Sequence, residues 1–399
     1  MKKDELIYEF QVLLNESPES VAERERTAHD KLTKSFKNRL ILFGTGKLGR
    51  RTLKGLREVG IEPLAFCDNN SVIWGSDIEG LKVLSPEKAV NEFGANAAFV
   101  VTIWNDTLGH PFDQVEEQLQ SYGPCTVVSF LPLYWKYHGQ FLPYFSLDRP
   151  SKILAAREEI MHMMLLIKDS ESRSSFFNNI KSRFSGELGI IPGPIDKCIQ
   201  FRNEFLKANK EEVFVDAGAY TGDTLKLVLE SPPFEFREFI ALEPDPQNFT
   251  RLQKLISTFD EKLRSKITTF PIAAGSYNGE ISFDGSGTEQ ARISLSGHIK
   301  AKCRRLDDLL GKRGVTFIKM DIEGAELDAL ESASDIIKNQ SPILAVSVYH
   351  QIDHLWRILY LINSIKKGYA FFFRSHAAGG WDYILYAVPQ NRLATPLEA

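Results

Sequence analysis

The chain has 399 residues, of which 43% are hydrophobic and 25% are charged, and its formal net charge is -4. This composition is that of an ordinary globular protein, which argues against a disordered chain, and the length is sufficient for two domains. The small net charge gives no electrostatic reason to expect nucleic acid as a partner.

The first 37 residues are polar and mixed in charge. Their apolar positions Leu6, Phe10, Leu13 and Leu14 stand near helical spacing. We therefore expect an N-terminal helical segment over residues 1–37, lying against the domain that follows.

Residues 38–150 alternate short apolar runs with amphipathic stretches. Alternating strands and helices predict a parallel sheet that is covered on both faces, so we expect a Rossmann-like domain here. The expected strands are 40–43, 63–66, 97–101 and 126–128, and the expected helices are 47–59 and 112–122.

A glycine-rich turn follows the first of these strands. Gly44, Gly46 and Gly49 match the dinucleotide fingerprint, and Asp68 ends the second strand near the spacing of an acid that binds ribose. The domain also resembles small Rossmann-like domains that accompany sugar-modifying enzymes, some of which bind nucleotides or nucleotide-sugars. No Tyr-x-x-x-Lys pair for hydride transfer is present. Three interpretations stay open: a nucleotide or nucleotide-sugar site, an NAD(P) site, or a structural or docking loop.

The pattern becomes irregular towards residue 150, and residues 151–210 then read as a helical connector. Within it, 152–169 has the spacing of one amphipathic helix. A second α/β domain is expected over residues 211–390, with a short tail at 391–399.

The second domain opens with an apolar strand, 213–215, that ends in Asp216 and turns through Gly218 and Gly222. The next strand, 239–242, ends in Glu243. Parallel strands of this kind form a crevice at their carboxyl ends, and an acid at the second strand tip can accept hydrogen bonds from ribose hydroxyls. The pattern favours an adenosine-containing ligand.

Four stretches in this half resemble the FkbM family of S-adenosylmethionine (SAM) methyltransferases. The turn after Asp216 resembles the first motif of class I SAM methyltransferases, and 316–326 is similar to the family's signature strand and turn. The later stretches are 345–350, and 374–376 together with 383–386. The likeness covers about residues 190–390. It implies that the C-terminal domain has a class I SAM methyltransferase fold. Together with the N-terminal domain expected from its strand and helix pattern, this predicts an α/β protein with two Rossmann-like doubly wound domains.

The resemblance implies SAM as the cofactor and O-methylation as the reaction. Glu243 would bind the ribose hydroxyls, and Ala273 would admit the adenine ring, with backbone groups in place of an acid at 271–275. The turn beneath the methionine part and the ribose would be formed by Asp216, Gly218 and Gly222. The same turn holds Tyr220, Thr221 and Asp223, which would contact the amino-acid end of SAM.

Asp321 and His350 are the expected catalytic residues. Asp321 would orient the acceptor, accept its proton or hold the amino group of SAM, and it could also cap a helix expected at 323–331. His350 follows a strand expected at 343–348 and has the pKa range of a base, as does His376 after 369–373. The acids Asp321, Glu323 and Glu326 do not share one helical face, so no metal is expected.

Cysteine usage and hydropathy bear on the compartment. Cys67, Cys125, Cys198 and Cys303 are widely separated and form no Cys-x-x-Cys pair, which fits a reducing compartment. No apolar run approaches the roughly 20 residues that span a bilayer, and the first residues lack the apolar core of a signal peptide. We expect a cytoplasmic protein without a transmembrane segment.

The predicted acceptor is a sugar hydroxyl in a glycan or a glycan precursor, because of the accompanying N-terminal domain. Two alternatives stay open. One is an NAD(P)-dependent or sugar-nucleotide-modifying enzyme that uses the N-terminal glycine loop, and the other is a non-catalytic sensor of SAM or a nucleotide. A homo-oligomer is compatible with the sequence.

Overall fold

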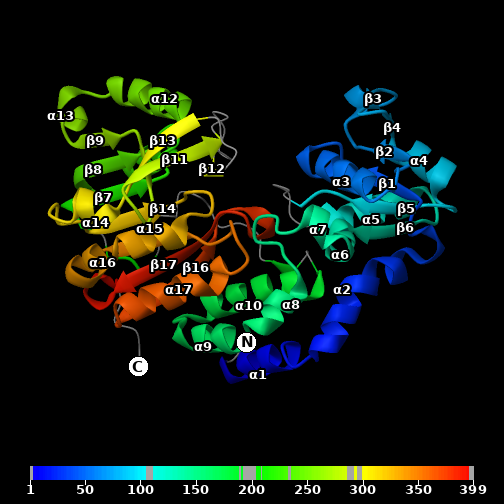
Figure 1. Ribbon diagram of the computed structural model, residues 1–399, viewed down its shortest axis with the longest axis horizontal. Helices are drawn as coiled ribbons and strands as arrows, with labels where there is room; N and C mark the ends of the chain where they lie inside the picture. Colours follow the sequence, from blue (N-terminus) through cyan, green and yellow to red (C-terminus); the bar gives the residue numbers. More distant parts are fainter. Residues whose placement is uncertain are drawn as a thin grey trace. The chain divides into compact units, whose positions relative to one another are not determined.

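The computed structural model describes residues 3–104, 111–187, 190–191, 204–207, 209–231, 235–284, 292–293 and 299–394. The chain divides into two compact units (Figure 1). Unit 1 comprises residues 1–161, 174–193 and 377–381, and unit 2 comprises 162–173, 194–376 and 382–399.

Unit 1 contains a six-stranded sheet in the order β3-β4-β2-β1-β5-β6. All neighbours are parallel except β3, which is antiparallel to β4 at the edge. The strands are β1 (Leu40–Phe43), β2 (Ala65–Cys67), β3 (Asp77–Ile78), β4 (Leu81–Leu84), β5 (Ala98–Val101) and β6 (Thr126–Ser129).

Helices cover both faces of this sheet, as a doubly wound fold requires. On one face Leu40 and Leu42 of β1 pack with Leu53 of α3. On the other, Ile41 and Phe43 pack with side chains of α4 and α5. The helices are α3 (Lys47–Glu58), α4 (Pro86–Phe93), α5 (Pro111–Tyr122), α6 (Phe130–Lys136) and α7 (His138–Phe141).

Helices form most of the segment 3–33 and of the segment 150–185, on either side of this sheet, and residues 188–189, 192–203 and 208 of the expected connector lie outside the described residues. Leu6, Phe10 and Leu14 of the first segment are buried. The single helix predicted at 152–169 is wrong, because the chain breaks it into two helices near Ala156 and starts a third at Ser170. The helices are α1 (Lys3–Leu13), α2 (Pro18–Thr33), α8 (Pro150–Ala155), α9 (Arg157–Leu166) and α10 (Ser170–Ser185).

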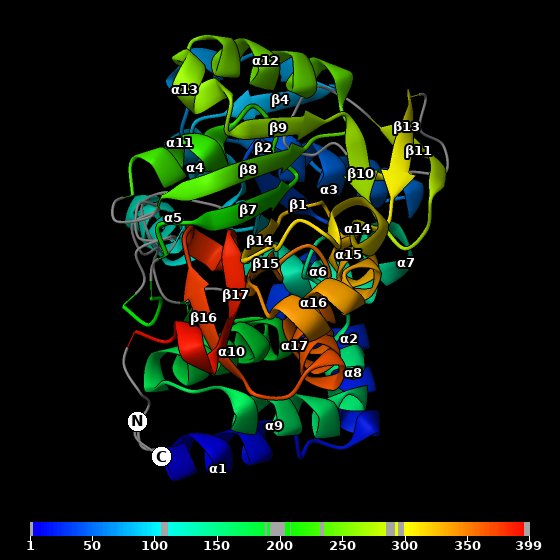
Figure 2. The same ribbon diagram turned by 90° about the vertical axis from the view of Figure 1, so that its left-hand side faces the viewer.

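Unit 2 is built on a seven-stranded sheet in the order β16-β17-β15-β14-β7-β8-β9, whose succession can be followed in Figure 2. Only β17 runs against its neighbours. The strands are β7 (Glu212–Ala217), β8 (Phe236–Leu242), β9 (Ile267–Phe270), β14 (Phe317–Met320), β15 (Ile343–Ser347), β16 (Tyr369–Ser375) and β17 (Tyr383–Pro389).

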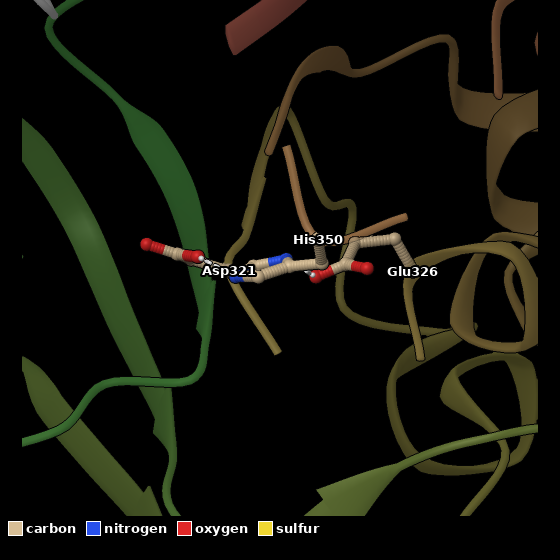
Figure 3. A group of neighbouring side chains, drawn as sticks. All are labelled: Asp321, Glu326 and His350. Carbon is tan, nitrogen blue, oxygen red and sulfur yellow. Dashed lines mark hydrogen bonds and ion pairs between the residues drawn. The ribbon is translucent and has the colours of Figure 1, made fainter. Parts of the chain in front are cut away.

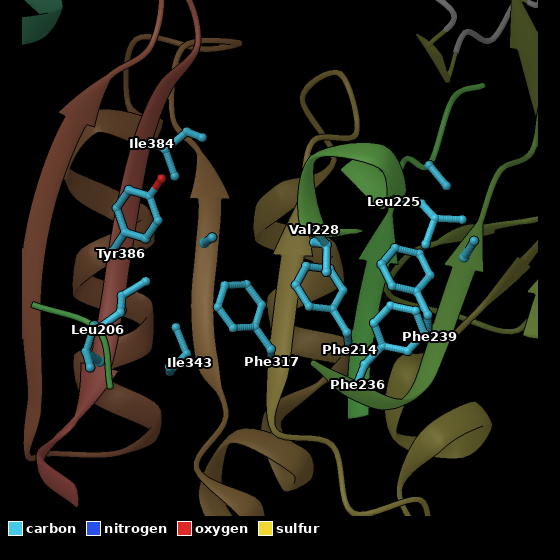
Figure 4. Packing of buried hydrophobic residues seen from close by; sticks show 14 of the residues in the cluster. Leu206, Phe214, Leu225, Val228, Phe236, Phe239, Phe317, Ile343, Ile384 and Tyr386 are labelled. Carbon is cyan, nitrogen blue, oxygen red and sulfur yellow. The ribbon is translucent and has the colours of Figure 1, made fainter. Parts of the chain in front are cut away.

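One face of this sheet carries a row of aromatic rings from neighbouring strands (Figure 4). Phe214 stacks on Phe239 and on Phe317, with ring centroids 5.0 and 4.6 Å apart. Leu225 and Val228 of α11 cover the row. The remaining helices of unit 2 are α11 (Asp223–Leu229), α12 (Pro246–Ser257), α13 (Glu261–Arg264), α14 (Leu306–Leu310), α15 (Glu326–Ser332), α16 (Ser334–Gln340) and α17 (His354–Ile365).

A smaller four-stranded sheet in the order β10-β13-β11-β12 completes unit 2. Its strands are β10 (Ile272–Ala274), β11 (Gly279–Asp284), β12 (Arg292–Ile293) and β13 (Ile299–Arg304).

The structure confirms the predicted fold class of two doubly wound α/β domains. Among the described residues, no helix combines the length and the apolar character that crossing a membrane requires.

Candidate active site

A charged pair replaces the aromatic row at the carboxyl ends of β7 and β14. Phe317 is in register with Phe214, and two residues further on Lys319 is in register with Asp216. Both charged side chains are buried, and Lys319 Nζ lies 3.4 Å from Asp216 Oδ1. Burial raises the pKa of Asp216 to about 7 although Lys319 opposes this shift. Burial would lower the pKa of Lys319, but the charges of Asp216, Asp321 and Asp223 raise it above its usual value.

The turn after β7 packs against the end of β14. Gly218 has a φ of +83°, and a Cβ at this position would stand 2.0 Å from the carbonyl oxygen of Asp321. Only glycine fits this approach without moving backbone. The N–H groups of Gly218 and Ala219 both donate to the carbonyl of Leu242, the last residue of β8. The glycine therefore sets the distance between the turn and Asp321.

Glu243, at the tip of β8, holds the same turn from the other side. Its Oε2 accepts from the backbone N–H of Tyr220 and its Oε1 from that of Asp245, both at 2.8 Å. Burial raises the pKa of Glu243 to about 7 although these two donors lower it. A carboxylate offers about four lone-pair positions, so the donors among the described residues leave two of them for a ligand.

Asp321, His350 and Glu326 form a line in which the imidazole ring lies between the two carboxylates (Figure 3). His350 Nδ1 lies 2.8 Å from Glu326 Oε1, and Nε2 lies 3.4 Å from Asp321 Oδ1 and 3.8 Å from Glu323 Oε1. The hydroxyl of Tyr349 donates to Asp321 Oδ1 at 3.2 Å.

The carboxylates around His350 govern its charge. Burial would lower the pKa of His350, but Glu326, Asp321 and Glu323 raise it to about 9. Burial would raise the pKa of Glu326, but His350 and His354 lower it well below its usual value. With these groups alone, His350 is a cation at neutral pH, which does not suit a general base.

The segment 321–325 is a turn rather than the first turn of a helix. Glu323 has a φ of +56° and Gly324 one of +104°. Glu326 Oε1 accepts from the N–H of Ile322 at 2.9 Å, so the acid at the start of α15 closes the turn. The helix predicted to begin at Glu323 therefore begins at Glu326, and the helical-face argument against a common cluster does not apply.

Other predicted residues are placed as follows. Tyr220, Thr221 and Gly222 form the turn before α11, and Asp223 is the first residue of that helix. Ala273 lies in β10 and packs with Ile281, Ala301 and Cys303. His376 is buried, with Nε2 2.9 Å from the hydroxyl of Tyr386.

In unit 1 the three loop glycines stand in different surroundings. Gly44 has a φ of +107°, and a Cβ at Gly49 would stand 1.9 Å from the carbonyl oxygen of Gly44. Gly46 has an ordinary φ of -69°, is exposed, and would meet nothing within 4 Å. Asp68 Oδ2 accepts from the N–H and the hydroxyl of Thr45, and its Oδ1 from the N–H of Asn70.

Sequence reasoning did not single out Lys319, Tyr349 or His354. Lys319 had a signal, because a lysine inside the apolar run 317–320 needs a buried partner. His354 reaches Glu326 Oε2 at 3.2 Å from α17, a contact between distant segments that spacing does not reveal.

The sheet order of unit 2, with its single antiparallel strand beside the edge, is that of the class I SAM methyltransferase fold. Residues 216–374 match the family model described as the Methyltransferase FkbM domain, which confirms the predicted resemblance. No curated protein matches the chain.

One solved structure supports the same fold. The methyltransferase FkbM from Methylobacillus flagellatus KT superposes with a TM-score of 0.79 at 22% identity, over 97% of this chain and 100% of that one. Two other structures align less well. An rRNA methylase from Streptococcus thermophilus has a TM-score of 0.31 at 9% identity, over 48% of this chain and 93% of its own. Aeropyrum pernix fibrillarin, with natively bound SAM, has a TM-score of 0.28 at 11% identity, over 45% of this chain and 67% of its own.

The similarity to the methyltransferase FkbM structure extends over both units and supports the fold of the chain. The family model assigns a methyltransferase domain to unit 2.

Proposed function

We propose that the chain is a SAM-dependent O-methyltransferase that acts on a sugar hydroxyl of a glycan or a glycan precursor. The observation that carries the proposal is Glu243, a buried acid at the tip of β8 that holds the glycine turn and keeps lone pairs for a diol. The free cysteines among the described residues, Cys67, Cys125 and Cys303, fit the cytoplasm as its place of action.

The residues at the strand ends fit SAM. Two ribose hydroxyls match the two lone-pair positions left on Glu243. The buried oxygens of Asp216 have no hydrogen-bond donor of good geometry among the described residues, so they can attract the positive end of a ligand above the turn. The remaining turn positions, Gly218, Tyr220, Thr221, Gly222 and Asp223, would line the methionine part and the ribose, and Ala273 the adenine.

The reaction needs positioning more than activation, because a sulfonium already carries a good leaving group. The acceptor oxygen forms a bond to the methyl carbon while the bond from that carbon to sulfur breaks, and S-adenosylhomocysteine leaves. Asp321, whose side chain is 29% exposed, takes the acceptor's proton in this proposal. His350 and Tyr349 position Asp321.

Turnover on a panel of sugars, nucleotide-sugars and glycans tests the proposal. The full chain should release S-adenosylhomocysteine with at least one acceptor. Asp321→Asn should lower kcat by about 10²–10⁴-fold, the usual contribution of a positioned base, with the affinity for S-adenosylhomocysteine retained. Glu331→Gln, an exposed change on α15, is the matched control. Tight cofactor binding without turnover on any acceptor, and no effect of His350→Ala, would support a sensor instead.

A nucleotide site in unit 1 is a second candidate, supported by Gly46. In dinucleotide loops the first glycine makes the turn, the second admits the pyrophosphate and the third packs the helix on the strand. Gly44, Gly46 and Gly49 have the corresponding surroundings, since only Gly46 has open space where a Cβ would stand.

Calorimetric titration with NAD(P) and nucleotide-sugars tests this second candidate. Binding that Gly46→Asp abolishes would support it, and absence of binding by the intact chain would leave the loop a structural role. If Gly46→Asp removed all catalytic activity while Asp216→Ala was harmless, the enzyme would be the oxidoreductase or sugar-nucleotide enzyme of the alternative interpretation.

A further inference from the structure

The imidazole of His350 presents one nitrogen to a pair of carboxylates. Its side chain is 2% exposed, and Nε2 has no hydrogen-bond partner among the described residues. The oxygens nearest to Nε2 are Asp321 Oδ1 at 3.4 Å and Glu323 Oε1 at 3.8 Å. A buried nitrogen that faces two acids needs a positive charge between them.

The spacing of these atoms suits a bound cation. Two ligand atoms that each lie about 2.1 Å from a metal stand about 3.0–3.4 Å apart in octahedral or tetrahedral geometry. The separation of 3.4 Å between Nε2 and Asp321 is in this range, and that of 3.8 Å to Glu323 is slightly wider. A charge-assisted N–H···O bond would be shorter, about 2.7–2.9 Å.

Glu326 contacts the ring nitrogen of His350 that would not bind the metal. Its Oε1 lies 2.8 Å from His350 Nδ1 and also accepts from the N–H of Ile322. A histidine that binds a metal through one nitrogen usually donates its other N–H to a carboxylate, which fixes the tautomer. Glu326, which is fully buried, gives Nδ1 that partner and leaves Nε2 for a ligand.

The turn before α15 brings the two candidate acids to the same nitrogen. Glu323 has a positive φ, so the chain reverses between Asp321 and Glu326 and both Asp321 and Glu323 approach Nε2. Glu326 also has a carboxylate oxygen within 4.8 Å of ligand atoms of Asp321 and His350, but its close contact is with Nδ1, whereas Glu323 approaches Nε2.

We propose that Asp321, Glu323 and His350 bind a divalent first-row transition metal, with Mn²⁺ and Zn²⁺ as the fitting ions, and that Glu326 orients His350 without binding the metal. One imidazole and two carboxylates suit these ions better than Mg²⁺, which prefers oxygen ligands. The prediction of no metal from sequence is revised accordingly. For the methyl transfer proposed above, the metal would bind the acceptor oxygen; that role rests on the proposed function, whereas metal binding itself does not.

Titration of the full chain with MnCl₂ after treatment with EDTA tests the site, with free Mn²⁺ followed by electron paramagnetic resonance. We expect the parent chain to bind one ion. Glu326→Gln should bind it on the order of 10–100-fold more weakly. His350→Ala and Glu323→Gln should each abolish binding. Glu323→Gln keeps the test valid if the buried histidine variant fails to fold, and Glu331→Gln should bind like the parent.

Two results would overturn the proposal. One is no binding of Mn²⁺ or of Zn²⁺ in a parallel calorimetric titration, which would leave a proton on Nε2 as the charge between the acids. The other is binding that Glu323→Gln and His350→Ala leave unchanged. S-adenosylhomocysteine is titrated in the presence of EDTA as well, because its binding without metal separates a failure of this site from a failure of the proposed methyl transfer.

Discussion

The two units build the same strand ends from different residues. In unit 1 the N–H of Gly44 donates to Cys67 and that of Thr102 to Phe43. In unit 2 the N–H of Gly218 donates to Leu242 and that of Asp321 to Ala217, in the same relative positions. The strand orders β4-β2-β1-β5-β6 and β9-β8-β7-β14-β15 correspond as well.

The units differ in the pair of residues in register just before the ends of the two central strands. Leu42 is in register with Val100 in unit 1, where Asp216 is in register with Lys319 in unit 2. All four side chains are buried. Thr102, whose hydroxyl donates to the carbonyls of Phe43 and Gly44, stands where unit 2 has Asp321.

The acids that follow the second strand of each unit, Asp68 and Glu243, also differ in the number of lone-pair positions that remain for a ligand. Among the described residues, Asp68 accepts three hydrogen bonds, two from Thr45 of the glycine turn and one from Asn70, whereas Glu243 accepts two. With about four lone-pair positions on a carboxylate, Glu243 can take both hydroxyls of a ribose and Asp68 only one. The shared strand order and turn hydrogen bonds thus define the fold of both units. The charged residues at the strand ends define the candidate site of unit 2.

The largest expected effect comes from breaking the buried pair. Lys319→Met leaves Asp216 buried without its counter-charge, which should lower the free energy of unfolding by about 3–5 kcal/mol. The double variant Asp216→Leu, Lys319→Val installs the pair found in unit 1 and should recover most of this loss, because apolar replacements of buried ion pairs are often neutral. Calorimetric melting of the three proteins measures both effects.

The double variant also separates folding from function. It should melt like the parent yet bind S-adenosylhomocysteine poorly. A double variant that was no more stable than Lys319→Met would show that unit 2 does not tolerate the apolar row of unit 1.

The loss of stability on replacing a loop glycine with alanine should depend on what surrounds that glycine. Gly218→Ala places a Cβ against backbone at a positive φ, and Gly49→Ala places one against the Gly44 carbonyl. Overpacking of this kind costs about 1–3 kcal/mol, and the strained φ at Gly218 adds about 1–3 kcal/mol. Gly46→Ala should change the free energy of unfolding by less than about 0.5 kcal/mol, as for other exposed sites. Equal melting shifts for Gly46→Ala and Gly49→Ala would contradict this ranking.

The smallest expected effect is a pH dependence of cofactor affinity. The pKa of Glu243 is raised to about 7 by burial. The ionised form accepts hydrogen bonds from ribose, so affinity for S-adenosylhomocysteine should rise with pH through this value, by up to about tenfold between pH 6 and 8. Glu243→Gln should reduce the rise, whereas Asp68→Asn should leave it unchanged. A profile that stays flat in the parent would be inconsistent with Glu243 as the ribose acid.

The sequence predicted the sheet frame well, because the strands are short apolar runs and the turns carry glycine. It also placed Asp216, Glu243, Asp321 and His350 at the carboxyl ends of the strands. The roles of these residues stay predictions. It placed the start of α15 wrongly, since Glu323 adopts a positive φ that a non-glycine residue rarely shows.

The contacts that join distant segments could not be predicted. Glu326 meets His350 and His354 only after α15, β15 and α17 have packed together. The sequence therefore predicted that the three acids lie on different faces of a helix, whereas Glu326 is fully buried beside His350.

Calorimetric titration with S-adenosylhomocysteine tests the central claim most directly, on the parent chain, Asp216→Ala with Glu243→Ala, and Asp68→Ala. We predict micromolar binding by the parent and by Asp68→Ala. Loss of the charge-assisted bonds of Glu243, each about 1.5–3 kcal/mol, should remove binding in the double variant. No binding by the parent, or binding that depends on Asp68 and not on Glu243, would contradict the account.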